Sequence, residues 1–257
     1  MKILHVTGFS GTGKTTFIKG LLAELNKIGT TAVVKHMGHH LWELEEKKDT
    51  TIFFESGAHI SCGIDDEKSV LVTDDSSLDT ILEIFSNMGI HYAIVEGFKS
   101  KPYAKICMGD ASGLENVLCT NPELSDVLAL LPKFDDFYTI EGLVRELKAS
   151  CDMREAGAIL TFNGIVRERS GEERTEYLDF FEDFDRLIED IRQEMESVDG
   201  ILGVRFHHRA GRLYAGEDIT YIAIIARRRK EAFFALSRAI DRMKKELHDW
   251  GKDLAGA

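Results

Sequence analysis

The chain has 257 residues and a net charge of −12, and its composition is that of an ordinary water-soluble protein. This length suffices for one large domain or two small ones. The acidic balance argues against a general nucleic-acid or anionic-membrane binder, and no apolar run reaches the roughly 18 residues of a membrane-spanning helix. The four cysteines are scattered and no secretory signal is recognisable, so we expect a cytoplasmic protein without a disulfide framework.

Charge chemistry divides the chain into two halves. Residues 1–150 hold 13 Lys and one Arg against 22 acids, whereas residues 151–257 hold 4 Lys and 14 Arg against 22 acids. We therefore predict two domains, 1–150 and 151–257, joined near Ser150 without a flexible linker. Because the planar arginine fork binds phosphate and carboxylate in a bidentate manner, the second domain is expected to offer a different kind of anion site.

The first half contains a glycine-rich loop with the phosphate-loop spacing, Gly8-Phe9-Ser10-Gly11-Thr12-Gly13-Lys14-Thr15. An apolar β-favouring run at residues 3–7 precedes it. A helical apolar pattern over residues 17–28 follows, with Gly29 as the expected stop. Strand, glycine loop and helix stand in the order that nucleotide binding requires. The predicted nucleotide-binding residues are Gly8, Gly11, Thr12, Gly13, Lys14, Thr15 and Thr16.

The roles of these residues follow from their chemistry. Glycines let successive backbone N–H groups approach phosphate oxygens, and the start of the helix adds its positive dipole end. Lys14 is expected to bind the β- and γ-phosphates, and the Thr15 hydroxyl is expected to bind Mg²⁺.

Further along the first half, strands are predicted at residues 31–36, 68–73, 104–108 and 116–120, and helices at 78–88 and 140–148. The apolar strand at 91–98 ends with Glu96, which is expected to bind Mg²⁺ through water or to orient a hydrolytic water. The alternation of strands and helices predicts an α/β fold, a P-loop NTPase parallel sheet flanked by helices. His36, His39 and His40 form a cluster that favours surface or substrate-loop roles over a metal site.

Residues 1–150 resemble MobB, the GTP-binding accessory family of molybdopterin guanine dinucleotide biosynthesis. The resemblance rests on the phosphate loop, on Lys35-His36 and the histidines after it, on Lys48-Asp49 before Ser56-Gly57-Ala58, and on Glu96-Gly97-Phe98-Lys99. It implies GTP with Mg²⁺ as the ligand. The residues themselves do not distinguish GTP from ATP, because no Asn-Lys-x-Asp signature is present and Asn121 is a poor substitute.

In the second half, strands are predicted at 158–167, 201–208 and 219–226, and helices at 182–197 and 231–248. These elements do not alternate regularly, which predicts a smaller α+β domain. The run Arg227-Arg228-Arg229-Lys230 follows a buried strand in an acidic chain. Chemistry alone leaves two alternatives open for it, a solvated face or a pocket for a phosphorylated small molecule.

Residues 157–252 resemble MoaE, the large catalytic subunit of molybdopterin synthase, which has an α/β-hammerhead fold. The resemblance rests on Gly157-Ala158 through Gly164-x-Val166-Arg167, on His208-Arg209-x-Gly211-x-Leu213, on Gly216-Glu217 and on Arg229-x-x-Ala232-Phe233. It implies transfer of sulfur from the thiocarboxylate of a small ubiquitin-like, MoaD-like carrier to cyclic pyranopterin monophosphate.

The resemblance also implies roles for individual residues. Arg167 and Arg229 would hold the substrate phosphate or the carrier tail, and Lys244 would stabilise charge or transfer protons, with Lys252 beside it. Arg228, His208, Arg209 and Lys245 are further candidates for substrate binding. Both families imply a homodimer.

The second half departs from the MoaE pattern at two places. Arg228 stands where the family has histidine, and the final Pro-x-Trp-Lys is replaced by His248-Asp249-Trp250-Gly251-Lys252. An alternative is therefore a nucleotide-dependent adaptor whose second domain is a non-catalytic scaffold. A P-loop kinase for a small metabolite is a further alternative, but it needs a basic lid, and Arg145 is the only arginine in residues 1–150.

Overall fold

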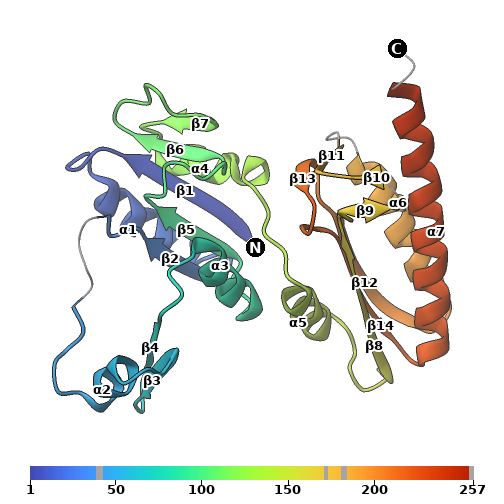
Figure 1. Cartoon of the computed structure of the whole chain (residues 1–257), viewed down its shortest axis with the longest axis horizontal. Coiled ribbons are helices and arrows are strands. Elements are labelled where there is room, and N and C mark those ends of the chain that lie inside the picture. The colour runs from blue at the N-terminus through green and yellow to red at the C-terminus, as the bar shows by residue number, and fades with distance from the viewer. Residues whose placement is uncertain (39–42, 171–172, 181–183, 255–257) are drawn as a thin grey trace. The chain divides into compact units, whose positions relative to one another are not determined.

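In a computed structural model, the chain consists of two compact units, Met1–Phe137 and Tyr138–Ala257 (Figure 1). The structure describes residues 1–38, 43–170, 173–180 and 184–254. Within these residues, no helix combines the length and the apolar composition that crossing a membrane requires.

The first unit is built on a five-stranded parallel sheet with the order β2-β5-β1-β6-β7. The strands are β1 (Lys2–Gly8), β2 (Thr31–Lys35), β5 (Tyr92–Glu96), β6 (Lys105–Met108) and β7 (Val117–Thr120). Helices α1 (Lys14–Leu25) and α4 (Leu124–Ala129) cover one face, and α3 (Leu78–Asn87) covers the other. The α/β fold predicted from the sequence is confirmed.

Alternation along β1 separates the two faces of this sheet. Leu4 and Val6 pack with Ile18 and Leu21 of α1, whereas Ile3 packs with Leu82 of α3. All six of these side chains are buried. Because both faces are covered, the central strands β1 and β5 are mainly apolar, as is usual in parallel sheets.

One predicted strand does not belong to the parallel sheet. Residues 69–73 form β4 (Ser69–Thr73), which pairs with β3 (Ile60–Ile64) as an antiparallel hairpin after α2 (Asp49–Glu55). The connection is too short for a parallel crossover. It turns tightly because the Asp65 carboxylate accepts hydrogen bonds from the backbone N–H groups of Glu67 and Lys68, both at 2.8 Å.

The sequence patterns did not predict α2, β3 or α4, nor the 3₁₀ turn η1 (Leu131–Lys133). A signal for α4 was present, since Glu123 and Asp126 form a reciprocal capping box at its start. The helix α1 ends at Leu25, earlier than the expected stop at Gly29, whereas Gly89 follows α3 with the positive φ of +80° expected of a terminating glycine.

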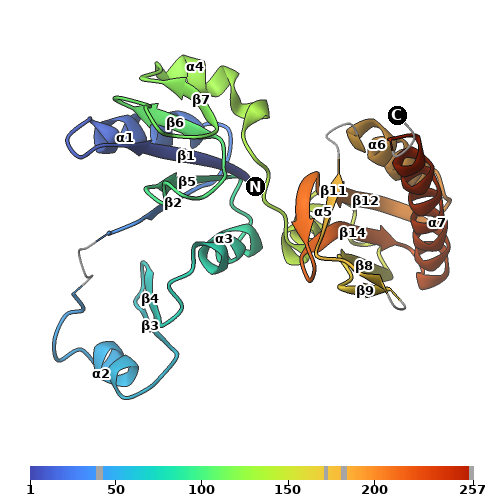
Figure 2. The ribbon, with the colours of Figure 1, turned by 45° about the horizontal axis from the view of Figure 1, so that its top comes forward.

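The second unit has a three-stranded antiparallel sheet with the order β12-β14-β8. Its main elements are α5 (Ile140–Ser150), β8 (Ala158–Ile165), α6 (Asp185–Glu196), β12 (Ile201–His208), β14 (Asp218–Ala226) and α7 (Arg229–Leu254). Two short pairs, β9 (Arg169–Ser170) with β10 (Glu173–Arg174) and β11 (Tyr177–Phe180) with β13 (Gly211–Tyr214), complete it. In Figure 2, α6 and α7 lie together beside the sheet. The prediction of a smaller α+β unit is confirmed.

The division between the units lies earlier than the predicted position near Ser150. Helix α5 belongs to the second unit, because Leu143 and Leu147 pack with Tyr221 and Ile225 on the face of the sheet opposite α6 and α7. The change from lysine to arginine begins only after this helix. Charge composition therefore misplaced a boundary that apolar packing determines.

Replacing Leu147 with alanine tests this assignment. Since Leu147 is fully buried, we expect the change to destabilise the second unit by about 2–5 kcal/mol. Hydrogen exchange measured by mass spectrometry should show faster exchange in β12 and β14 and unchanged exchange in β1 and β5. The exposed Lys148→Ala in the same helix serves as the control. Loss of protection in β1 would contradict the assignment.

Candidate functional site

The phosphate loop has backbone angles that only glycine adopts readily. Gly11 and Gly13 have φ values of +79° and +82°, and Gly13 is the residue that precedes the first turn of α1. Gly8 has φ +143°, and a Cβ atom there would overlap the carbonyl oxygen of Met108 on β6. The loop therefore lies close to the carboxyl end of β6, with the start of α1 directly behind it.

Lys14 is the basic group of this loop, and its ammonium group is held by the loop itself. The Nζ atom donates to the carbonyl oxygens of Phe9 at 2.5 Å and Gly8 at 3.2 Å. The Thr12 hydroxyl also donates to the Phe9 carbonyl, at 2.9 Å. Thr15 and Thr16 are exposed at the start of α1. The predicted nucleotide-binding residues of this loop thus lie together.

Glu96 lies at the same edge of the sheet as the phosphate loop. It is the last residue of β5, and it pairs in register with Val6 of β1 and Lys35 of β2. Its carboxylate is largely buried and lies 3.2 Å from the Nζ atom of Lys35. Within the described part of the chain, no three His, Cys, Asp or Glu side chains form a metal site. An ion here would need phosphate or water ligands besides Thr15 and Glu96.

The histidine cluster is only partly visible. His39 and His40 lie outside the described residues, and His36 packs its ring against Phe98 at 4.6 Å between centroids. Asn121 has a structural role, because its amide group accepts from the Gly109 N–H at 2.7 Å and donates to the Gly109 carbonyl at 3.3 Å. These two contacts connect the residue after β6 to the residue after β7.

Sequence analysis missed His5, which lies beneath the segment that follows Glu96. The imidazole is fully buried on β1, and its Nε2–H group donates to the Gly97 carbonyl at 2.5 Å. Burial lowers the pKa of His5 below its usual value, so the ring is neutral at pH 7. The only sequence signal was one histidine in an otherwise apolar strand.

In the second unit, the antiparallel register determines which candidates lie together. His208 pairs with Thr220, and Ile165 pairs with Asp218, so His208, Arg209 and Arg167 lie at one end of the sheet. Ala226 pairs with Ala158 and Ile201 at the opposite end, where Arg228 and Arg229 follow. The nine residues of β14 separate the two ends by about 26 Å. Arg167 and Arg229 therefore do not lie together within a single chain.

Lys244 lies at the Arg167 end of the sheet. Helix α7 returns along the sheet from the Arg229 end, and its buried residues Ala232 and Met243 belong to one core cluster with β14. Fifteen residues at 1.5 Å each place Lys244 about 22 Å beyond Arg229. Lys252 belongs to the last part of α7, and its side chain lies outside the described residues.

Lys244 and Lys245 point about 100° apart around the axis of α7, one toward each flank of the helix. Lys245 shares the flank of Arg238 and Arg242, which bind Glu194 of α6 at 2.6 and 2.9 Å. Lys244 shares the flank of Phe233 and Ile240. Since α6 packs on β12 and α7 contacts β8, this second flank lies over the β8 edge, from which Arg167 follows.

His208 is half-buried between aromatic rings. Phe180 and Phe184 approach it edge-on, with centroids at 5.1 and 5.9 Å, and its Nδ1–H group donates to the Arg209 carbonyl at 3.0 Å. Burial lowers the pKa of His208, so the ring is neutral at pH 7. This hydrogen bond leaves the Nε2 lone pair available to accept a proton.

The candidate arginines of the second unit differ in their hydrogen bonds and ion pairs. Arg209 donates to the Asp218 carbonyl at 2.9 Å and lies 3.6 Å from the Glu217 carboxylate, so it stabilises the start of β14. In the described part of the chain, neither Arg167 nor the pair Arg228 and Arg229 forms an ion pair with a carboxylate. Their exposed guanidinium groups therefore remain available for an anion.

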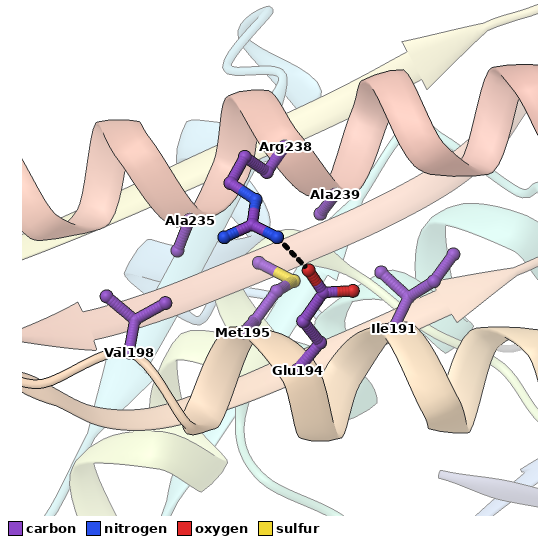
Figure 3. Close-up of a pocket in the computed structure, with 7 residues that line it drawn as sticks. All are labelled: Ile191, Glu194, Met195, Val198, Ala235, Arg238 and Ala239. Carbon is purple, nitrogen blue, oxygen red and sulfur yellow. Dashed lines mark hydrogen bonds and ion pairs between the residues drawn. The ribbon is translucent and has the colours of Figure 1, made fainter.

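A small cavity in the second unit is unrelated to these groups (Figure 3). It has a volume of about 10 Å³, which holds no more than a water molecule. Its lining comes from α6 and α7, where Arg238 and Glu194 form an ion pair at 2.6 Å beside the core side chain of Met195. We regard it as a packing gap between the two helices.

Comparison with known families assigns both units. Residues 3–133 match the family model of molybdopterin guanine dinucleotide synthesis protein B, MobB. Residues 139–246 match the family model of the MoaE protein. The chain belongs to the MobB family over its first unit and to the MoaE family over its second. The two matches separate where the structure divides, with α5 in the MoaE unit.

Two individual relatives and one solved structure are similar to all or part of the chain. A probable molybdopterin synthase of Haloferax volcanii is 32% identical over 263 residues, which cover 97% of this chain and 95% of that protein. The molybdopterin synthase catalytic subunit of a Nostoc species is 28% identical, over 54% of this chain and 87% of that protein. The crystal structure of Bacillus subtilis MobB is 23% identical, with a TM-score of 0.43, over 51% of this chain and 98% of that one. The Haloferax protein aligns with both units, so their combination in one chain is not unique.

The neutral state of His208 predicts how the stability of the MoaE unit depends on pH. An unfolded imidazole titrates near 6.5, and the folded one titrates lower, so protonation favours unfolding. We expect the free energy of unfolding to fall as the pH decreases through and below 6.5, and to be unaffected by this group above that pH. NMR titration of the imidazole C–H signals measures the pKa directly.

His208→Asn is the matched variant, because its amide can replace the Nδ1–H donor without titrating. It should reduce the pH dependence of unfolding between about pH 6.5 and pH 5. A His208 midpoint at or above 6.5 in the folded protein would contradict the expectation.

Proposed function

We propose that the MobB unit binds Mg²⁺ and a nucleoside triphosphate at the phosphate loop. The observation that carries this proposal is the loop itself, with left-handed glycines directly before α1 and the ammonium of Lys14 against its carbonyls. Phosphate oxygens would replace those two carbonyls as acceptors, and the N–H groups at the start of α1 would bind the anion.

The metal in this proposal is bound from two elements. Thr15 at the start of α1 and Glu96 at the end of β5 supply the oxygen ligands, directly or through water, that Mg²⁺ prefers. Guanine rather than adenine is proposed from membership of the MobB family. A kinase for small metabolites is disfavoured, because residues 1–137 contain no arginine that could form a basic lid.

Lys14→Ala is expected to lower the affinity for Mg–GTP by about 100-fold, because it removes a charge-assisted contact to phosphate. Isothermal titration calorimetry on the full chain measures this, and circular dichroism checks that the protein remains folded. Lys19→Ala removes an exposed lysine of the same helix and should bind normally. Unchanged affinity in Lys14→Ala would refute the site.

We propose that the MoaE unit transfers sulfur as a molybdopterin-synthase-type enzyme. The observation behind this is that Arg167, His208 and Lys244 lie at one end of the unit. The thiocarboxylate sulfur of a MoaD-like carrier would attack a carbon of cyclic pyranopterin monophosphate and displace the oxygen substituent of that carbon, which leaves with a proton. Water would then hydrolyse the resulting thioester, releasing the carrier as a carboxylate and leaving the sulfur on the substrate. Lys244 would stabilise the negative charge that develops, while Arg167 binds an anionic group of substrate or carrier.

We further propose that the working form is a homodimer. Arg228 and Arg229 lie about 26 Å from the Arg167 end in one chain, so only a second copy could bring them to Lys244. The Lys244 flank of α7 presents an exposed apolar side chain, Phe233, with 57% of its surface accessible. A two-fold axis that crosses this flank perpendicular to α7 would place the Arg229 end of one copy against the Lys244 end of the other.

Lys244→Ala is expected to reduce sulfur transfer by about 100-fold or more while leaving carrier binding intact. The assay mixes the full chain with thiocarboxylated carrier and cyclic pyranopterin monophosphate and follows the product as its fluorescent oxidation derivative. Lys245→Ala, on the opposite flank of α7, should retain activity. Equal losses in both variants would remove the special role of Lys244.

Mixing two inactive variants extends this test to the dimer. Lys244→Ala and Arg229→Ala chains, combined after exchange of subunits, should regain about a quarter of wild-type activity, because half of the dimers then hold one intact site. No recovery would contradict the shared site. If the wild-type chain itself binds carrier without forming product, the adaptor function replaces the synthase function.

A further inference from the structure

The MobB unit has to neutralise phosphate charge without arginine. Residues 1–137 contain none, so its cationic side chains are lysines and histidines. Three lysines lie near the phosphate loop, Lys14 in the loop, Lys35 at the end of β2, and Lys99 in the segment after Glu96. Each of these three ammonium groups has a partner within the protein.

The contacts that hold the three ammonium groups differ in strength. Lys14 donates to two carbonyl oxygens, and Lys35 forms an ion pair with Glu96 at 3.2 Å. Lys99 lies over the ring of Phe9, with its Nζ atom 4.7 Å from the centroid. Because Phe9 is 59% exposed, this cation–π contact is well solvated and the weakest of the three. Lys99 is thus the lysine that a phosphate would displace most readily.

Phe9 brings Lys99 to the place where phosphate would bind. It is the second residue of the loop, and Lys14 reaches its carbonyl while Lys99 reaches its ring. The two ammonium groups therefore converge on one residue from different elements. One comes from the start of α1, and the other comes from the connection between β5 and β6.

The backbone around Lys99 is fixed by hydrogen bonds from two buried side chains, His5 and Lys105. Segment 97–104 joins β5 to β6, which lie on either side of β1 in the sheet. His5 of β1 binds the Gly97 carbonyl at 2.5 Å, and Lys105, only 2% exposed, binds the carbonyls of Lys101 and Tyr103 at 2.8 and 3.1 Å.

The neighbour of Lys99 on the N-terminal side is also fixed. The ring of Phe98 packs against His36 and joins the core cluster with α3. The main chain of this segment is therefore anchored on both sides of Lys99, whose own side chain remains exposed. An exposed side chain on a fixed backbone can change its partner without any rearrangement of the fold.

We propose that Lys99 is a second phosphate-binding lysine that leaves the Phe9 ring and binds the terminal phosphate of a bound nucleoside triphosphate. The inner phosphates would be surrounded by the N–H groups of the loop, so a group that enters from segment 97–104 meets the outermost phosphate. This inference rests on the proposed nucleotide site. It adds discrimination between triphosphate and diphosphate to that site.

The test compares the affinities of the full chain for Mg–GTP and Mg–GDP by calorimetry. Lys99→Met keeps the apolar stem, and we expect it to weaken GTP binding about tenfold and GDP binding less than twofold. Lys99→Arg keeps the charge and should retain most of the preference for GTP. Unchanged GTP affinity in Lys99→Met, or equal weakening of GTP and GDP, would overturn the proposal.

Lys101→Met is the matched control. Lys101 lies in the same segment, but its ammonium group forms an ion pair with Asp79 of α3 at 2.8 Å. The same net charge is lost, so a purely long-range effect would weaken GTP binding equally in both variants and would overturn the proposal. Lys14→Ala distinguishes failure of this proposal from failure of the nucleotide site. If the nucleotide site is wrong, Lys14→Ala binds GTP as the wild type does. If only the role of Lys99 is wrong, Lys14→Ala weakens GTP binding and Lys99→Met does not.

Discussion

The central position of β1 in the parallel sheet is the constraint on which the MobB unit depends. Because β1 is hydrogen-bonded to both β5 and β6, the end of β1 that opens into the phosphate loop lies beside the ends of its two neighbours. The register then places Glu96 next to Val6, two residues before Gly8. The same arrangement forces segment 97–104 to cross β1, where the buried donors of His5 and Lys105 meet its carbonyls. One strand order thus determines the loop, the acid and the lysine-bearing segment together.

In the MoaE unit, an antiparallel register has the opposite consequence. Successive strands run in opposite directions, so residues that follow β8 and residues that follow β14 lie at different ends of the sheet. Arg167 and Arg229 are consequently far apart in one chain, although each lies just beyond the end of a strand. Helix α7 returns over the sheet and brings Lys244 back to the Arg167 end. Sheet topology therefore explains why this unit, unlike the MobB unit, cannot assemble all of its candidate residues from one copy.

Periodicity and local motifs predicted the elements that form these two sheets, because buried strands and amphipathic helices leave regular patterns. They failed where the deciding contact is remote in sequence. The attachment of α5, for example, depends on Leu147 meeting Tyr221 of β14. The distance between Arg167 and Arg229 likewise requires the strand register, which family resemblance alone does not supply. The β3–β4 hairpin is a different case, because its Asp65 turn is a local signal that was overlooked. The anchoring role of His5 had no local signal beyond its unusual place in an apolar strand.

The division of lysine and arginine between the two units has a physical interpretation. An ammonium group on a flexible stem binds one acceptor after another, and Lys14, Lys35 and Lys99 each engage a carbonyl, a carboxylate or a ring that a phosphate can replace. A guanidinium group instead holds a planar partner in fixed geometry, as Arg212 holds Asp179 through two hydrogen bonds at 2.9 and 3.0 Å. Lysines would therefore suit the phosphate loop if it binds and releases a nucleotide as proposed. Arginines would suit the anion-binding role proposed for the MoaE unit.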